Sequence, residues 1–326
     1  MNQKTAAAPA RDRLSLREIT PDAKFTDPDI TVDGEVRASV SPRQLTTLWI
    51  NTGSLCNLAC ESCYLESTPT NDRLAYVSTD EVRTLLDEIR QEEYPTGEIG
   101  FTGGEPFLNP NMIDILQLCL ERGFVVLVLT NAMNTMYKVR ERLLAMHQEF
   151  GHKLKLRVSL DHYRESRHAQ ERGPRSWRPA IRGLQWLSDN SLQFSVAGRT
   201  FWGEEETAMR SGYADMFARN EINLDAFNPG DLILFPEMDP AANVPEITTS
   251  CWSILNKDPA EIMCASSRMV VKHKGDGHLS VQACTLLPYD QRFNMGSTLK
   301  QSWRPIKLNH PHCAKFCVLG GGSCSG

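Results

Sequence analysis

Long apolar segments are missing from this sequence of 326 residues. The longest apolar run is Phe124 to Leu129, whereas a membrane-spanning helix needs about 20 apolar residues. The first residues also lack an apolar segment followed by a cleavage site, so we expect no secretory signal. These absences predict a soluble, cytoplasmic protein without a membrane partner, in which cysteine thiols stay reduced.

A strong excess of one charge is also missing. The 35 Lys and Arg residues face 40 Asp and Glu residues, which gives a net charge of -5. This balance argues against a dedicated nucleic-acid-binding protein. Hydrophobic residues make up 41% and charged residues 23% of the chain, which excludes a disordered or collagen-like chain. The length predicts about two domains or one large one.

Cysteine is scarce in most of the chain and concentrated at its end. Four of the ten cysteines lie in residues 1–250, and six lie in the last 76 residues. In a reducing compartment, clustered cysteines indicate metal or redox chemistry rather than a disulfide framework.

The chain divides into three parts by its pattern of apolar residues. Residues 1–43 are polar with little periodicity, and we expect a flexible leader there. Residues 44–240 alternate strands with helices through short connections, which predicts an α/β fold, a partial (βα)6 barrel of parallel strands. Residues 241–326 lose this rhythm, and we expect a small cysteine-rich region held by metal. The predicted strands are 45–51, 98–102, 124–129, 154–160, 192–197 and 232–235, and the predicted helices are 78–92, 109–120, 136–150, 177–187 and 204–218.

The first candidate site is Cys56, Cys60 and Cys63, a C-x-x-x-C-x-x-C spacing directly after a predicted strand. Three thiolates this close can hold one face of an iron-sulfur cube. A [4Fe-4S] cluster needs four ligands, so three cysteines leave one iron open for a small molecule. A zinc site with a distant fourth ligand is the alternative.

The second candidate site is Gly103-Gly104-Glu105-Pro106, at the end of the next predicted strand. Paired glycines let the backbone approach a ligand closely, and a carboxylate can accept hydrogen bonds from an ammonium group. Ligands of parallel sheets bind at this end of the strands. Alone, the sequence is also that of an ordinary turn.

Together and in this order, the two motifs resemble those of the radical S-adenosylmethionine (radical SAM) superfamily. The resemblance implies that Cys56, Cys60 and Cys63 bind a [4Fe-4S] cluster whose open iron is chelated by S-adenosylmethionine. It also implies that Gly103, Gly104 and Glu105 line the methionine end, with Glu105 accepting the ammonium group. Ser62 departs from the pattern, because the family usually has an aromatic residue there, and Tyr64 follows the third cysteine instead.

Polar residues also follow later predicted strands. In the family such positions face the cofactor, so the resemblance implies that Ser159 and Asp161 lie near the ribose. It implies likewise that Arg199 pairs with the methionine carboxylate, and that Thr130-Asn131 faces the cofactor or substrate. Each residue could instead be an ordinary strand-end cap or part of a surface ion pair.

The C-terminal cysteines form a third candidate site. A β-hairpin is predicted around Gly275-Asp276-Gly277, with Cys264 and Cys284 at its two bases. It looks like the auxiliary-cluster hairpin of the SPASM and twitch subfamilies, which implies at least one auxiliary [4Fe-4S] cluster; a structural zinc site is the alternative. The candidate ligands are Cys251, Cys264, Cys284, Cys313, Cys317 and Cys324. Cys119 lies inside an apolar helix, and we expect a buried thiol there.

The resemblance implies an enzyme that reductively cleaves S-adenosylmethionine to a 5'-deoxyadenosyl radical, which abstracts hydrogen from a substrate. An external electron donor such as flavodoxin or ferredoxin would be its partner. The sequence does not decide whether the substrate is a peptide or protein or a small molecule. A non-catalytic iron-sulfur or zinc protein, for electron transfer or scaffolding, is the alternative from another class.

Overall fold

Six parallel strands form most of the central sheet in the computed structural model, which describes residues 24–200, 202–236 and 243–322. Each strand pairs with the next one along the sequence. They are β2 (Thr47–Asn51), β3 (Glu98–Thr102), β4 (Val125–Thr130), β5 (Leu154–Ser159), β6 (Gln193–Arg199) and β7 (Leu232–Phe235). All six correspond to predicted strands, so the α/β partial barrel is confirmed.

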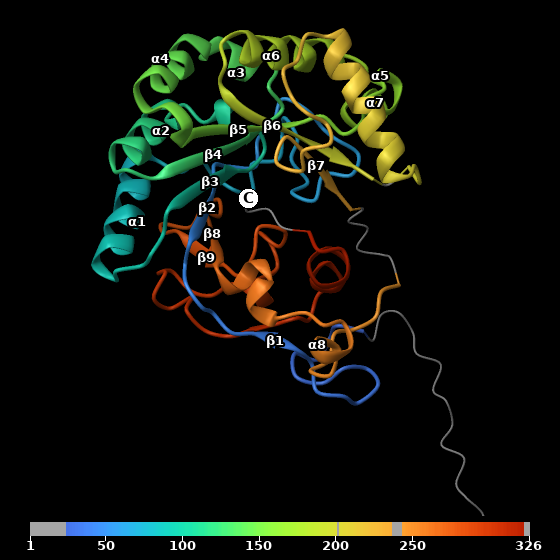
Figure 1. Ribbon diagram of the computed structural model, residues 1–326. Coiled ribbons are helices and arrows are strands. Elements are labelled where there is room, and N and C mark those ends of the chain that lie inside the picture. Colours follow the sequence, from blue (N-terminus) through green and yellow to red (C-terminus); the bar gives the residue numbers. More distant parts are fainter. Residues whose placement is uncertain (1–23, 201, 237–242, 323–326) are drawn as a thin grey trace, which may run out of the picture.

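Helices cover the outer face of this curved sheet (Figure 1). They are α1 (Thr79–Gln91), α2 (Met112–Glu121), α3 (Asn134–Lys138), α4 (Arg140–Phe150), α5 (Glu165–Arg172), α6 (Trp177–Asp189) and α7 (Glu206–Arg219). Helix α1 begins at a capping box, in which Ser78 Oγ accepts the Glu81 N–H and the Glu81 carboxylate accepts the Ser78 N–H. Its apolar residues recur on one face, which packs into the core.

Two helices differ from the sequence prediction. The predicted helix 136–150 begins at Asn134 and is divided at Val139 into α3 and α4. Helix α5 is not predicted at all, because the side chains it buries are the polar His168 and Glu171. A search for regularly spaced apolar residues therefore cannot detect this helix.

The C-terminal region continues the barrel sheet. Strand β8 (Ser267–Val271) pairs in parallel with β2, and β9 (Ser280–Gln282) pairs antiparallel with β8. The predicted hairpin between Cys264 and Cys284 is therefore present, and it joins the sheet at the edge where the barrel begins. The remaining elements here are α8 (Cys251–Ile254), β10 (Ile306–Lys307), a π-helix (Cys313–Leu319) and 3₁₀ turns at Pro259–Glu261, Met263–Ala265 and Gln291–Phe293.

The described part of the expected flexible leader, residues 24–43, is docked on the C-terminal region, so the expectation is wrong there. Strand β1 (Ser39–Val40) pairs with β10 (Figure 1). Arg37 forms a buried ion pair with Glu246, with Nη2 2.6 Å from Oε1. The same carboxylate accepts the N–H groups of Phe25 and Val32. Local periodicity is weak because these contacts are made with residues about 200 positions away.

Two apolar cores meet at the sheet. One lies between the sheet and the helices, and the other joins the inner face of the barrel to the C-terminal region. Trp49 and Leu127 come from barrel strands but belong to the second core, beside Met269 and Phe316. The inner face of the sheet is therefore partly filled by the C-terminal region.

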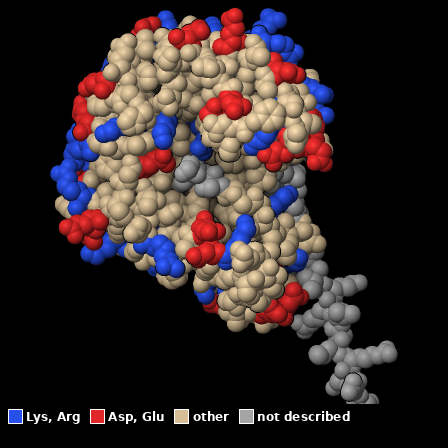
Figure 2. Space-filling model, viewed as in Figure 1, with Lys and Arg blue, Asp and Glu red and all other residues tan. Residues whose placement is uncertain are grey.

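The molecular surface has mixed charge on the face that Figure 2 shows, where Lys and Arg lie among Asp and Glu. No helix among the described residues has both the length and the apolar character needed to cross a membrane.

Candidate functional site

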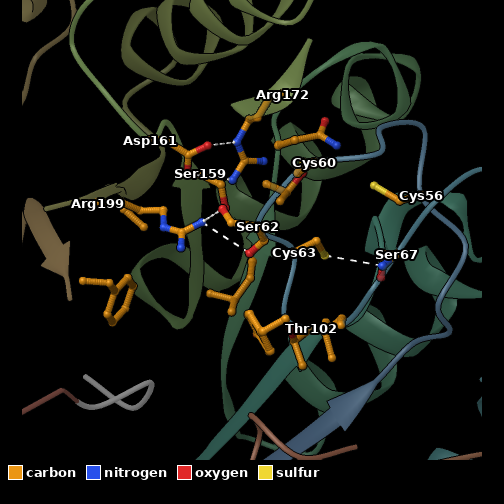
Figure 3. Close-up of a pocket in the computed structure, with 18 of the residues that line it drawn as sticks. Cys56, Cys60, Ser62, Cys63, Ser67, Thr102, Ser159, Asp161, Arg172 and Arg199 are labelled. Carbon is orange, nitrogen blue, oxygen red and sulfur yellow. Dashed lines mark hydrogen bonds and ion pairs between the residues drawn. The ribbon is translucent and has the colours of Figure 1, made fainter. Parts of the chain in front are cut away.

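The first three cysteines line one cavity at the C-terminal end of the barrel strands. The loop after β2 brings Cys56, Cys60 and Cys63 to this cavity, whose volume is about 180 Å³ (Figure 3). The Cys56 N–H donates to Thr68 O at 3.0 Å, and the Ser67 N–H lies 3.4 Å from Cys63 Sγ. Burial raises the pKa of the Cys56 thiol to about 12 and also raises that of Cys60. Bound metal would compensate for the burial of these thiolates.

Gly103 and Gly104 line the same cavity and also hold the cysteine loop. The Gly104 N–H donates to Gly53 O at 2.8 Å. A Cβ at Gly104 would overlap the carbonyl of Leu55, the residue before Cys56. Gly103 has φ +141°, a conformation open to glycine. Part of the need for glycine is therefore the close contact between β3 and the cysteine loop.

Glu105 lies beside the cavity but not among the residues that line it, which differs from the expectation. It is 1% exposed, and its carboxylate accepts the Thr130 hydroxyl at 2.8 Å and the Asn131 N–H at 2.9 Å. Burial raises its pKa to about 7, although these hydrogen bonds favour the charged form. In this conformation Glu105 ties the end of β4 to β3, while Thr130 and Asn131 face the cavity.

Ser159 and Asp161 line the cavity as predicted, but Asp161 has a partner in the protein. Arg172 of α5 binds it with two hydrogen bonds, from Nε to Oδ2 at 2.6 Å and from Nη2 to Oδ1 at 3.1 Å (Figure 3). Burial alone would raise the pKa of Asp161, but the charge and hydrogen bonds of Arg172 outweigh it and lower the pKa. Arg172 also faces the cavity and so belongs to the site.

Arg199 lines the cavity and contacts the cysteine loop. Its guanidinium donates to the Ser62 hydroxyl (Figure 3). The Ser62 hydroxyl in turn donates to the Glu171 carboxylate. Arg199 Nη1 also lies 3.9 Å from Glu171 Oε2. Ser62, where the family usually has an aromatic residue, therefore connects the loop between Cys60 and Cys63 to α5 and β6.

The rest of the cavity wall is mostly apolar and comes from both the barrel and the C-terminal region. Phe235 of β7 and Phe316 of the π-helix stack with ring centroids 5.8 Å apart. The other apolar lining residues are Tyr64, Leu65, Leu129, Ala197 and Leu286, and Arg157 adds a further cation.

Four of the six C-terminal cysteines line a second, smaller cavity. Cys264 and Cys284 come from the two bases of the hairpin, and Cys313 and Cys317 come from the π-helix. Burial raises the pKa of the Cys264 thiol to about 11 and that of Cys313 to about 12. The remaining lining residues are apolar except for His312. Four cysteines are a ligand set found both in iron-sulfur clusters and in structural zinc sites.

The other candidate cysteines lie elsewhere. Cys251 is not among the lining residues of the second cavity, and its Sγ lies 3.4 Å from the Thr248 N–H. Cys324 is outside the described residues. Cys119 is fully buried in α2, as predicted. Within the described ranges, no three His, Cys, Asp or Glu side chains converge closely enough to hold a single metal ion.

The comparison with protein families agrees with this geometry. Residues 50–207 match the Radical SAM superfamily, and the match includes both the cysteine loop and Gly103-Gly104-Glu105. Residues 50–207 belong to the radical SAM superfamily.

The chain is similar in sequence to a curated biosynthesis protein and in fold to several solved structures. It is 31% identical over 191 residues to the antilisterial bacteriocin subtilosin biosynthesis protein AlbA of Bacillus subtilis (strain 168), covering 56% of this chain and 40% of AlbA. Its fold resembles that of Streptococcus suis SuiB bound to precursor peptide SuiA, with a TM-score of 0.56 and 13% identity, over 81% of this chain and 65% of SuiB. It also resembles anSMEcpe with bound AdoMet, with a TM-score of 0.56 and 14% identity, over 83% of both chains.

The radical SAM motifs do not reveal Glu171 and Arg172, which hold Ser62 and Asp161 from α5. One signal for this helix is present in the sequence. Gly173 ends α5 with φ +89°, the usual role of glycine after a helix. This glycine marks the end of a helix. A helix that buries polar side chains close to the end of a barrel strand is a candidate to hold site residues in place.

Proposed function

We propose that this chain is a radical SAM enzyme that modifies a peptide or protein. Its first cluster would be a [4Fe-4S] cluster held by Cys56, Cys60 and Cys63. The observation that supports this most is that these cysteines, Gly103 and Gly104 line one cavity at the C-terminal end of the strands. When bound, the cluster would supply the electron for reductive cleavage of S-adenosylmethionine, and so the radical chemistry that removes a hydrogen atom from the substrate.

The charged residues of the cavity would bind and orient S-adenosylmethionine. Gly103 and Gly104 would allow its methionine end to lie against the backbone, and Thr130 and Asn131 offer hydroxyl and amide groups beside them. Asp161 is held by Arg172 in an orientation that leaves both side chains in the cavity wall. Ser159, which lines the same cavity, would contribute a hydroxyl for the ribose. Arg199 would stabilise the loop that holds the cluster while presenting its charge to the cavity.

The substrate would reach the cavity where the C-terminal region meets the barrel. Phe235, Phe316 and Leu286 form an apolar wall there, which suits the side chain of a peptide and excludes water from a reactive carbon. The similarity to AlbA, and the fold shared with SuiB in its complex with a precursor peptide, support a peptide over a small molecule.

We also propose that Cys264, Cys284, Cys313 and Cys317 hold an auxiliary [4Fe-4S] cluster. Four thiols complete its ligand set. An electron removed from the substrate radical could leave through this site. An external one-electron donor such as a flavodoxin or ferredoxin would reduce the first cluster.

The decisive experiment is anaerobic reconstitution with iron and sulfide, followed by dithionite and S-adenosylmethionine. We expect 5'-deoxyadenosine from the wild type and none above background from Cys60→Ala. Equal amounts from both proteins would refute the proposed enzyme and favour an electron-transfer or scaffolding protein. Peptides encoded beside this gene can then be added, and a mass change that depends on S-adenosylmethionine identifies the substrate.

Iron counting tests the auxiliary cluster. A variant with Cys56, Cys60 and Cys63 all changed to alanine should keep about four iron atoms per chain. Loss of all iron from this triple-alanine variant would remove the auxiliary cluster from the proposal.

A further inference from the structure

A buried arginine lies beside two of the four C-terminal cysteines, Cys264 and Cys284. Arg268 is in β8, four residues after Cys264, and its side chain is fully buried. Its Nη1 donates to Cys264 O at 2.6 Å, and its Nε donates to Ser302 O at 3.1 Å. The guanidinium also lies over the ring of Trp303, 5.1 Å from its centroid.

The described residues do not neutralise this charge. All hydrogen-bond acceptors that the described residues provide are main-chain carbonyls, and Nη2 is buried without an acceptor. Apart from Tyr94, the groups whose charge acts on Arg268 are Cys264 and Cys284. Burial lowers its pKa only to about 10, so the guanidinium stays protonated at neutral pH. A buried cation without a counter-charge is expensive, and the fold must supply an anion nearby.

A four-cysteine iron-sulfur cluster is such an anion. Its thiolates give it a net negative charge, and one-electron reduction adds another. A fixed positive charge close by favours the reduced form. Net charge and hydrogen bonds around a cluster are known determinants of its reduction potential.

We propose that Arg268 is the counter-charge of the auxiliary cluster and raises its reduction potential, a role that rests on the proposed auxiliary cluster. Arg268 would act on the cluster through its positive charge and would contact no substrate, so it is not a catalytic residue. Its effect would make the auxiliary cluster a better acceptor for an electron that leaves the substrate.

The test measures potential rather than activity. The triple-alanine variant would retain the auxiliary cluster as its one cluster and serves as the parent protein. The parent, Arg268→Gln and Arg268→Lys are compared by redox titration followed by electron paramagnetic resonance. For Arg268→Gln we expect the ratio of reduced to oxidised cluster at a fixed potential to fall about tenfold, which is about 59 mV for a one-electron couple. Arg268→Lys should stay close to the parent because the charge is kept.

A matched control is Arg210→Gln, since Arg210 in α7 also donates to main-chain carbonyls, those of Ala226 and Leu232. It should leave the potential unchanged. An equal potential in the parent and in loaded Arg268→Gln would overturn the role of Arg268. If Arg268→Gln fails to take up iron, uptake by Arg268→Lys supports the counter-charge, and failure of both variants overturns it in favour of a structural role. A parent without iron refutes the auxiliary cluster itself, which is a different result.

Discussion

The two cysteine sites use the same thiol ligands but differ in what surrounds them. Around Cys56, Cys60 and Cys63 the cavity also contains arginine, aspartate and polar strand ends. Around the four C-terminal cysteines the wall is almost entirely apolar, and Arg268, the cation that contacts Cys264, is buried. A three-thiol site lined by polar groups suits a further ligand, whereas four thiols enclosed by apolar residues would complete the ligand set of a cluster.

This difference also has a structural origin. The first site lies on loops at the strand ends, where backbone and side chains are free to take ligand contacts. The second lies between a hairpin of the extended sheet and a π-helix, and both elements are packed into the second core. Chemistry is therefore expected at the first site and electron transfer at the second.

The largest effect is expected when the second site is dismantled. In the triple-alanine variant, a further change of Cys313 and Cys317 to alanine should lower the iron content from about four atoms per chain to near zero. The matched control Cys251→Ala should keep its iron, because Cys251 is not among the lining residues of the second cavity. Loss of iron from the Cys251 variant would show that the four-thiol set is incomplete.

A second test damages the first site and leaves the second intact. In Gly104→Ala the new Cβ would overlap the Leu55 carbonyl, which is rigid backbone next to Cys56. We expect S-adenosylmethionine cleavage to fall at least about a hundredfold and stability to fall by about 3 kcal/mol, as for other overpacked sites. The auxiliary iron should remain in the chain.

The control for this change is Gly97→Ala, because a Cβ there would meet no atom within 4 Å. It should stay close to the wild type in 5'-deoxyadenosine formation and thermal midpoint. Equal activity of Gly104→Ala and the wild type would show that the glycine contact with the cysteine loop is unimportant.

The sequence allowed prediction of most of the fold and of the positions that meet at the first site. Buried strands such as Val125–Thr130 are apolar on both faces, and cysteine spacing is local, so both can be recognised along the chain. Contacts between distant segments could not be recognised in this way. Arg37 and Glu246 are 209 residues apart, and their ion pair docks residues that by themselves look like a leader.

The sequence also left open which C-terminal cysteines act together. All six were candidate ligands, and the packing of the hairpin against the π-helix brings four of them to one cavity. Gly103 and Gly104 line the cavity, but the contacts of Glu105 depend on β4, which follows 20 residues later. Buried polar residues that hold other side chains in place do not recur at a regular spacing, so the sequence pattern does not reveal them.

A third test concerns the pH dependence of the first site. Burial raises the pKa of Glu105 to about 7 from 4.5, so the folded chain holds this proton more tightly than the unfolded chain does. Stability should therefore fall as pH rises from about 4.5 to about 7, by about 3 kcal/mol at most. In Glu105→Gln this part of the pH dependence should be absent.

The measurement is the unfolding midpoint of the ligand-free protein between pH 4.5 and pH 8. Glu149→Gln is the control, because Glu149 is exposed on α4, and it should keep the wild-type slope. If wild type and Glu105→Gln have the same slope, the buried carboxylate does not titrate in this range.

The smallest effect is expected from Ser62→Ala. The hydroxyl connects Arg199 to Glu171, but Ser62 is exposed, so solvent can replace part of the interaction. Hydrogen bonds to charged groups contribute about 1.5–3 kcal/mol to stability when they are shielded from solvent. Here we expect a loss of about 1 kcal/mol in the free energy of S-adenosylmethionine binding, which corresponds to a roughly fivefold higher KM. Ser253→Ala in α8, which also removes an exposed hydroxyl, should leave KM unchanged. Because the connection belongs to the first site alone, the potential of the auxiliary cluster should not move. A shifted potential with an unchanged KM would mean that the two sites are coupled through this loop and that their separation is wrong.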